Sequence, residues 1–72
     1  MEPFEQRLID EHKQLKDRLN KLNKFLSTPT FDGLELTEKS LLLAQKACMT
    51  GYYEVLTVRL YNRGLLEGGD AN

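Results

Sequence analysis

His12 and Cys48 are the residues whose types could support nucleophilic catalysis, since a thiolate attacks and an imidazole carries protons. They are the only His and the only Cys of the chain. They fall in different helical segments, and antiparallel pairing of those segments places them far apart. Cys48 lies among small apolar neighbours, where a thiol is usually buried and inert. We therefore expect no enzyme, no catalytic residue, no cofactor and no metal site.

A second group with chemical potential is the aromatic and basic run GYYEVLTVRLYNR at residues 51–63. Tyrosine rings stack on bases, and guanidinium groups bind phosphates two bonds at a time. A net charge of −1 disfavours general nucleic-acid binding and favours a small anionic nucleotide. The alternative is structural, because tyrosine is common at helix interfaces. The candidate ligand-binding residues are Arg59, Arg63, Tyr53, Tyr61, Lys46, Arg18 and Lys21.

The length of 72 residues limits how these groups can be positioned. A core of this size rarely supplies more than about 3–5 kcal/mol, so small proteins add disulfides, metals or oligomerisation. A single Cys cannot form an internal disulfide, which leaves oligomerisation. The sequence has no apolar run near membrane-spanning length and no apolar signal-peptide core, so we expect a cytoplasmic protein without membrane contact.

The first predicted helix covers about residues 3–27. Pro3 suits a first helical turn, and Glu5 favours the positive end of the helix dipole. From Leu8 to Leu26, apolar residues and His12 recur at alternating spacings of four and three, which is a heptad pattern. The predicted inner face of this helix consists of Leu8, His12, Leu15, Leu19, Leu22 and Leu26.

A linker at 28–36 and a second helix at about 37–63 follow. Thr28 before Pro29 is suited to cap one short helical turn within the linker. Thr37 is the predicted N-cap of the second helix, and Gly64 suits a left-handed C-terminal position with Leu65 packed back on the helix. We expect one domain at 1–66 and a disordered tail at 67–72.

The second helix carries two apolar stripes. The inner one would pack on the first helix through Leu42, Gln45, Met49, Tyr52 and Leu56, and continues to Arg59. The other, which we call the small-residue stripe, consists of Leu41, Ala44, Cys48, Gly51, Val55 and Val58. A helix that is apolar over so wide an arc must bury both sides. The stripe is therefore the predicted oligomer interface, unless Phe31, Leu34 and the Leu65–Leu66 segment cover it within one chain. The predicted fold is an all-α antiparallel two-helix hairpin assembled into a helical-bundle homo-oligomer.

One pattern runs through most of the chain. Its residues are Phe4, Arg7, Glu11, Leu15, Arg18, KLNKF at 21–25, FDGL at 31–34, Glu38, Leu42, Gln45, Met49, Tyr52, Leu56 and Arg59. This pattern resembles a group of small helical-hairpin proteins from bacteriophages and prophages, including crAss-like phages. Gly51 and the GGDAN ending depart from it.

The resemblance implies an activity directed at the host rather than a virion component. In size and architecture the chain is also similar to phage sponges, which are oligomers that sequester nucleotide signals of bacterial immunity. The expected function is therefore a non-enzymatic sponge for a cyclic-nucleotide or nucleotide-derived signal. The alternative is a small interaction module that binds and inhibits a host protein. The expected partners are further copies of the chain and either a nucleotide ligand or a host protein.

Overall fold

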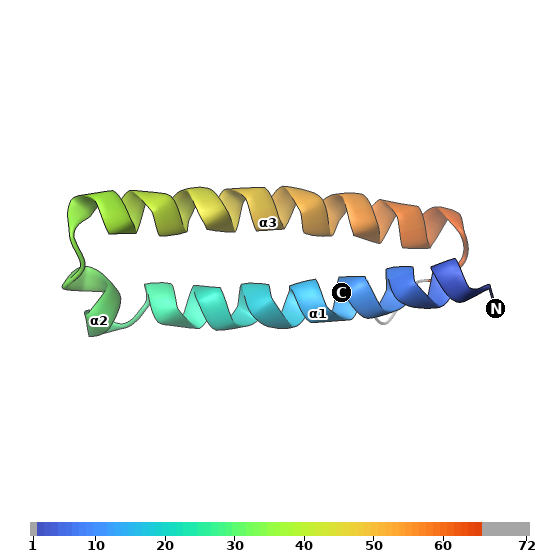
Figure 1. The fold of residues 1–72 in the computed structure, drawn as a ribbon, viewed down its shortest axis with the longest axis horizontal. Helices are drawn as coiled ribbons and strands as arrows, with labels where there is room; N and C mark the ends of the chain where they lie inside the picture. The colour runs from blue at the N-terminus through green and yellow to red at the C-terminus, as the bar shows by residue number, and fades with distance from the viewer. Residues whose placement is uncertain (1, 66–72) are drawn as a thin grey trace.

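The computed structural model describes residues 2–65 of the chain. Within that range it is all-α, as predicted, with three helices and no strand: α1 at Pro3–Leu26, α2 at Pro29–Asp32 and α3 at Leu36–Asn62. Figure 1 shows α1 and α3 side by side in opposite directions, with α2 connecting them at one end. None of the helices in this range has the length and apolar character needed to cross a membrane. The proposed tail at 67–72 lies outside the described residues.

Local side-chain chemistry fixes the ends of α1 and the position of α2. Glu5 accepts a hydrogen bond of 3.2 Å from the backbone N–H of Glu2, which closes the first turn of α1. Thr28 caps α2 by accepting from the backbone N–H of Phe31 at 3.3 Å. Both features begin with a proline at the first helical position, as the sequence predicts.

The two ends of α3 follow different rules. Glu35 is the N-cap, so the helix begins two residues before the position that a Thr37 cap requires. It begins without a side-chain cap, and its first backbone hydrogen bond runs from Lys39 N–H to the carbonyl of Glu35 at 3.0 Å. At the other end Gly64 adopts a φ of 70°. Leu65 N–H then bonds to Leu60 O and Gly64 N–H to Tyr61 O, each at 3.0 Å, which is the predicted Schellman motif.

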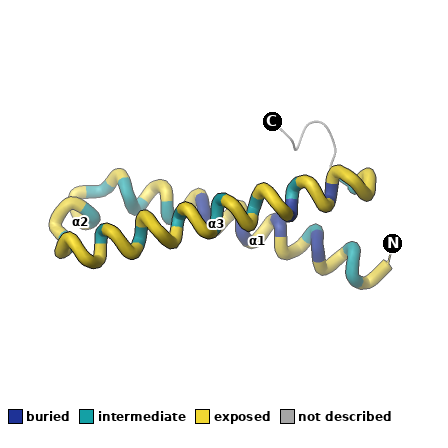
Figure 2. Tube along the Cα trace, turned by 90° about the horizontal axis from the view of Figure 1, so that it is seen from above, coloured by how far each residue is buried: buried dark blue, intermediate teal, exposed yellow. Residues whose placement is uncertain are grey.

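The buried core lies in the middle of the helix pair and toward the end away from α2 (Figure 2). The core contains Leu8, Leu15, Leu19, Leu56 and Leu60, with His12 buried among them. Nearer α2, the predicted inner-face residues Leu22 and Leu26 are only half-buried. The helix pair is therefore well packed except at the end near α2, which is incompletely covered.

The face that α3 turns toward α1 differs from the predicted one. Met49 and Leu56 face α1 as expected, but Tyr53 packs against the core and Tyr52 is 44% exposed. Gln45 is also exposed, and Leu60 is buried near the end of the helix. Apolar residues surround α3 on all sides, so spacing alone does not select one face. Contacts with α1 select it.

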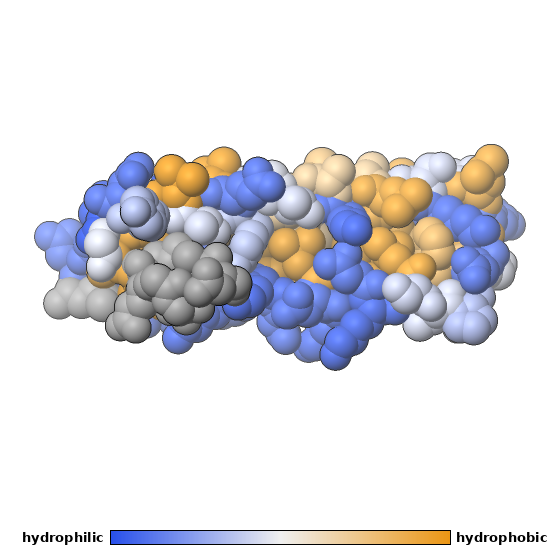
Figure 3. Space-filling model, turned by 180° about the vertical axis from the view of Figure 1, so that it is seen from behind, coloured by the Kyte–Doolittle hydropathy of each residue, from blue (hydrophilic) through white to orange (hydrophobic). Residues whose placement is uncertain are grey.

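The small-residue stripe is exposed along its whole length in the single chain. Leu41, Val55 and Val58 are each more than half exposed. Phe31 does not cover the stripe, because its ring packs edge-on against Phe25 at 6.3 Å. Figure 3 shows apolar side chains gathered on one face of the molecule toward the end that carries α2. The stripe that the sequence predicts as the oligomer interface is therefore accessible to a second copy of the chain.

Candidate ligand-binding site

His12 belongs to the core and makes a structural hydrogen-bond network. Its ring stacks on Tyr53 with centroids 4.5 Å apart, and Nε2 lies 2.8 Å from Thr57 Oγ1. The Thr57 hydroxyl donates its single proton to the carbonyl of Tyr53 at 2.8 Å. His12 Nε2 must therefore carry the hydrogen of the His12–Thr57 bond.

Cys48 lies on the exposed side of α3, whereas His12 is 6% exposed. The two residues thus sit in different environments, and the buried thiol that the sequence suggests is instead accessible in the single chain. Cys48 belongs to the small-residue stripe, so a second chain packed on that stripe would bury it. Among residues 2–65, no three His, Cys, Asp or Glu side chains lie close enough together to hold a metal ion.

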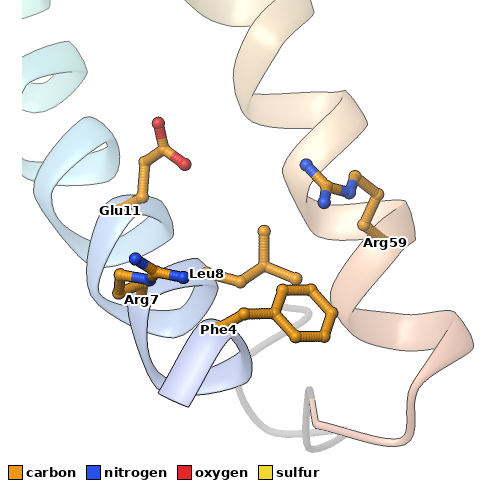
Figure 4. Close-up of a pocket in the computed structure, with 5 residues that line it drawn as sticks. All are labelled: Phe4, Arg7, Leu8, Glu11 and Arg59. Carbon is orange, nitrogen blue, oxygen red and sulfur yellow. The ribbon is translucent and has the colours of Figure 1, made fainter. Parts of the chain in front are cut away.

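A groove lies between the first turns of α1 and the last turns of α3 (Figure 4). Its volume is about 270 Å³, and it is lined by Phe4, Arg7, Leu8, Glu11 and Arg59. The four α1 residues share one helix face, because they follow at spacings of three and four. Arg59 extends toward them from α3. We call this site the arginine groove.

Among residues 2–65, no carboxylate pairs with either guanidinium group of the arginine groove. Within residues 2–65 the ion pairs are Lys21–Asp17 at 3.0 Å and Arg63–Glu5 at 3.5 Å, so neither Arg7 nor Arg59 takes part in one. Guanidinium groups bind carboxylate and phosphate through two parallel hydrogen bonds. Two of them above the apolar floor of Phe4 and Leu8 can therefore hold an anion that carries an apolar part.

Arg63 borders the arginine groove without lining it. Its guanidinium lies 4.2 Å from the centroid of the Phe4 ring, a cation–π contact, and it pairs with Glu5. Arg63, directly after α3, therefore helps to orient the Phe4 ring at the border of the groove.

Glu11 is held in place by Tyr52, whose hydroxyl donates a hydrogen bond to Glu11 Oε2 across the two long helices. This hydrogen bond raises the pKa of Tyr52, and desolvation and the charge of Glu11 act in the same direction, whereas Arg59 lowers it. A phenol that keeps its proton remains a donor to the carboxylate. Tyr52 thus joins α3 to the carboxylate side of the arginine groove.

The structure brings together only some of the predicted ligand-binding residues. Arg59 lines the arginine groove, and Arg63 reaches it through Phe4. Tyr53 is occupied by its stacking on His12, and Tyr61 is 70% exposed. The remaining candidates, Lys46, Arg18 and Lys21, do not line the groove.

Sequence reasoning missed Arg7 and the Phe4 ring as parts of the site. The available signal was the common face of Phe4, Arg7, Leu8 and Glu11 in the first helix. Antiparallel pairing predicts that Leu8 and Glu11 lie near Arg59, and both line the groove with it. Arg7 and Arg59 line the same groove from different helices, and the sequence pattern contained the information needed to pair them.

Within residues 2–65 the chain is a miniature all-α protein with three helices and a charged groove between two of them. The chain belongs to the Sequestin family, whose model matches residues 2–62. The family name indicates a sequestering role, which is a binding function.

A relative of the chain is encoded by Enterobacteria phage T4. It is described as the uncharacterized 7.5 kDa protein in the denB-rIIB intergenic region. The two are 35% identical over 57 residues, which cover 79% of this chain and 89% of the relative. No solved structure matches the chain. The chain is therefore related to a small phage protein, in agreement with the phage-type pattern in its sequence.

Proposed function

We propose that this protein is a phage-encoded sponge that acts in the cytoplasm of the bacterial host. It sequesters a cyclic-nucleotide or nucleotide-derived signal of antiviral immunity and thereby blunts the response. The observation that carries the proposal is the arginine groove, in which Arg7 and Arg59 have no carboxylate partners among residues 2–65. Membership of the Sequestin family supports a sequestering role.

Self-association completes the proposal. The small-residue stripe is exposed, and the half of the molecule near α2 is incompletely covered, with Leu36 and Leu43 78% and 51% exposed. Burial of apolar area in a second copy stabilises such a surface by about 25 cal/mol per Å². Basic and aromatic residues outside the groove would then line clefts between protomers, namely the exposed Tyr61, Arg18 and Lys21 and the half-buried Lys46.

Isothermal titration calorimetry of the full chain tests the proposal. The ligands are cyclic dinucleotides, cyclic trinucleotides and cyclic ADP-ribose-type molecules. We expect at least one to bind, and Arg7→Ala and Arg59→Ala each to weaken it about tenfold or more, because each removes charge-assisted hydrogen bonds. Lys13→Ala removes the same charge from an exposed position of α1 outside the groove and should leave binding unchanged. If none of these ligands gives a heat of binding, the proposal is wrong.

The exposure of the small-residue stripe also supports a second candidate function. In this alternative the stripe docks on a host protein and inhibits it, instead of binding another copy of the chain. Light scattering separates the two candidates. A strict monomer at micromolar concentration favours the interaction module, whereas a stable oligomer favours the sponge.

A further inference from the structure

The arginine groove contains a carboxylate as well as two guanidinium groups. A site for a simple anion gains nothing from Glu11, because the carboxylate repels the anion. Glu11 is not neutralised by Arg7 or Arg59, since neither pair is within ion-pair distance. In Figure 4 the guanidinium of Arg59 lies on the α3 side of the groove, while Arg7 and Glu11 occupy successive turns of α1. The groove thus offers hydrogen-bond acceptors next to its anion-binding groups.

Tyr52 sets the orientation of these acceptors. Its hydroxyl donates to Glu11 Oε2, which leaves Oε1 and the remaining lone pairs of the carboxylate as acceptors for a ligand. The bond connects α3 to α1 and limits the rotation of the Glu11 side chain. Pre-orientation of this kind lowers the entropy cost of binding a ligand donor.

We propose that the arginine groove binds the ribosyl phosphate part of its ligand. The phosphate lies between Arg7 and Arg59, and the sugar hydroxyls donate to Glu11. The carbon face of the sugar packs on Phe4 and Leu8. This inference rests on the proposed function and deepens it by naming the part of the ligand that is recognised.

Volume and charge both favour this ligand chemistry. A volume of about 270 Å³ lies at the small end of ligand sites, which suits one ribosyl phosphate rather than an entire cyclic dinucleotide. The charged lining comprises two arginines and one glutamate. A phosphate with neutral hydroxyls satisfies all three groups, whereas a neutral zwitterion such as an amino acid leaves one guanidinium unmatched.

A matched pair of nucleotides isolates the role of the hydroxyls. NMR titration of the full chain compares adenosine 5′-monophosphate with its 2′,3′-dideoxy analogue, which has the same base and charge. We expect the wild-type chain to bind the ribonucleotide about tenfold more tightly, because hydrogen bonds to a charged acceptor are lost in the analogue. Glu11→Gln should bring the two affinities close together and strengthen binding of the dideoxy analogue, since the variant removes a repulsive charge.

The controls separate this inference from the proposed function. Asp17→Asn removes a negative charge elsewhere on α1 and should preserve the preference for the ribonucleotide. Equal binding of both nucleotides, with loss of binding in Arg7→Ala and Arg59→Ala, overturns the ribosyl inference and leaves the proposed function standing. Tighter binding of glycine than of either nucleotide also overturns it. If no nucleotide of either experiment binds, both proposals are wrong.

Discussion

At the scale of single residues, Tyr52 connects stability to pH. Its hydrogen bond to Glu11 raises the pKa of the phenol above the usual value of 10.0. A raised pKa means that the folded chain holds the phenolic proton more tightly than the unfolded chain. The contribution of this bond to stability is therefore complete below pH 10 and is lost as the pH rises through the folded pKa.

We predict that ultraviolet titration will detect this shift when Tyr52 is the only tyrosine. In the Tyr53→Phe, Tyr61→Phe background, the phenol should titrate above 10.0, and adding Glu11→Gln should move the midpoint back toward that value because the main cause of the shift is removed. Identical midpoints with and without Glu11→Gln would show that the Tyr52–Glu11 bond is not formed in solution.

Thr57 is the second residue whose role can be measured. Thr57→Val keeps the shape of the side chain but removes the acceptor for His12 Nε2–H. Leaving a buried donor without this acceptor costs about 1–3 kcal/mol, so urea unfolding followed by circular dichroism should show a loss of that size. Thr37→Val makes the same chemical change at an exposed position and should stay within about 0.5 kcal/mol of the wild type. Equal stability of the two variants would contradict a structural role for the network.

The types of residue in the sequence identified part of the candidate site. The packing of α1 against α3 identified the rest. Arg59 and Arg63 were candidates because they lie in one run with the tyrosines. Arg7 is more than 50 positions away in the sequence and becomes relevant only when α1 packs against α3. Contacts between distant segments do not follow from local spacing, which is why a groove shared by two helices is harder to predict than either helix.

At the scale of elements, local chemistry predicted where the helices begin and end better than which face of each helix packs inward. Pro3, Thr28 and Gly64 each act within a few residues of their own position, so the sequence alone locates the corresponding helix ends. The face of α3 is set by partners on α1, such as His12 stacking on Tyr53. A helix with a narrow apolar stripe would have made this face predictable.

Gly51 tests whether another helix approaches α3 closely. A Cβ atom at this position meets nothing within 4 Å in the single chain. Gly51→Ala should therefore stabilise the helix by about 1 kcal/mol through propensity alone. If a second copy packs closely on the small-residue stripe, the same change should also lower the mass measured by light scattering.

The reciprocal change provides the control for Gly51. Ala47→Gly alters helix propensity by the same amount in the opposite direction at an exposed position outside the stripe. It should lower helix stability without a specific effect on the oligomer. A stable oligomer in Gly51→Ala whose mass is unchanged would place the interface elsewhere.

At the scale of the whole molecule, the uneven core is the main argument for assembly. The buried leucines lie in the middle of the helix pair and toward the end away from α2, while Leu41 and Leu43, near α2, are 59% and 51% exposed. A single small core seldom provides more than about 3–5 kcal/mol, so a chain that leaves these residues in water has little stability to spare.

Charge placed in the stripe should disrupt assembly. Val55→Lys combined with Val58→Lys introduces two positive charges where both side chains are more than half exposed in the single chain. We expect light scattering to fall to the 8.3 kDa of one chain, because burying unpaired charges at an interface is costly. Gln14→Lys adds charge at an exposed position of α1 and should leave the mass unchanged. An unaltered mass in the double variant would exclude the stripe as the interface.

The contact between Glu5 and Arg63 has a further consequence for how copies of this protein can be combined. Because these residues pair, the beginning of α1 and the end of α3 lie at the same end of the molecule (Figure 1). Two copies joined in tandem therefore need only a short connector. Such a connector would raise the effective concentration of each copy near the other and favour their association. A dimer encoded as one polypeptide is thus geometrically accessible to this fold, and its two arginine grooves could then diverge to accept different ligands.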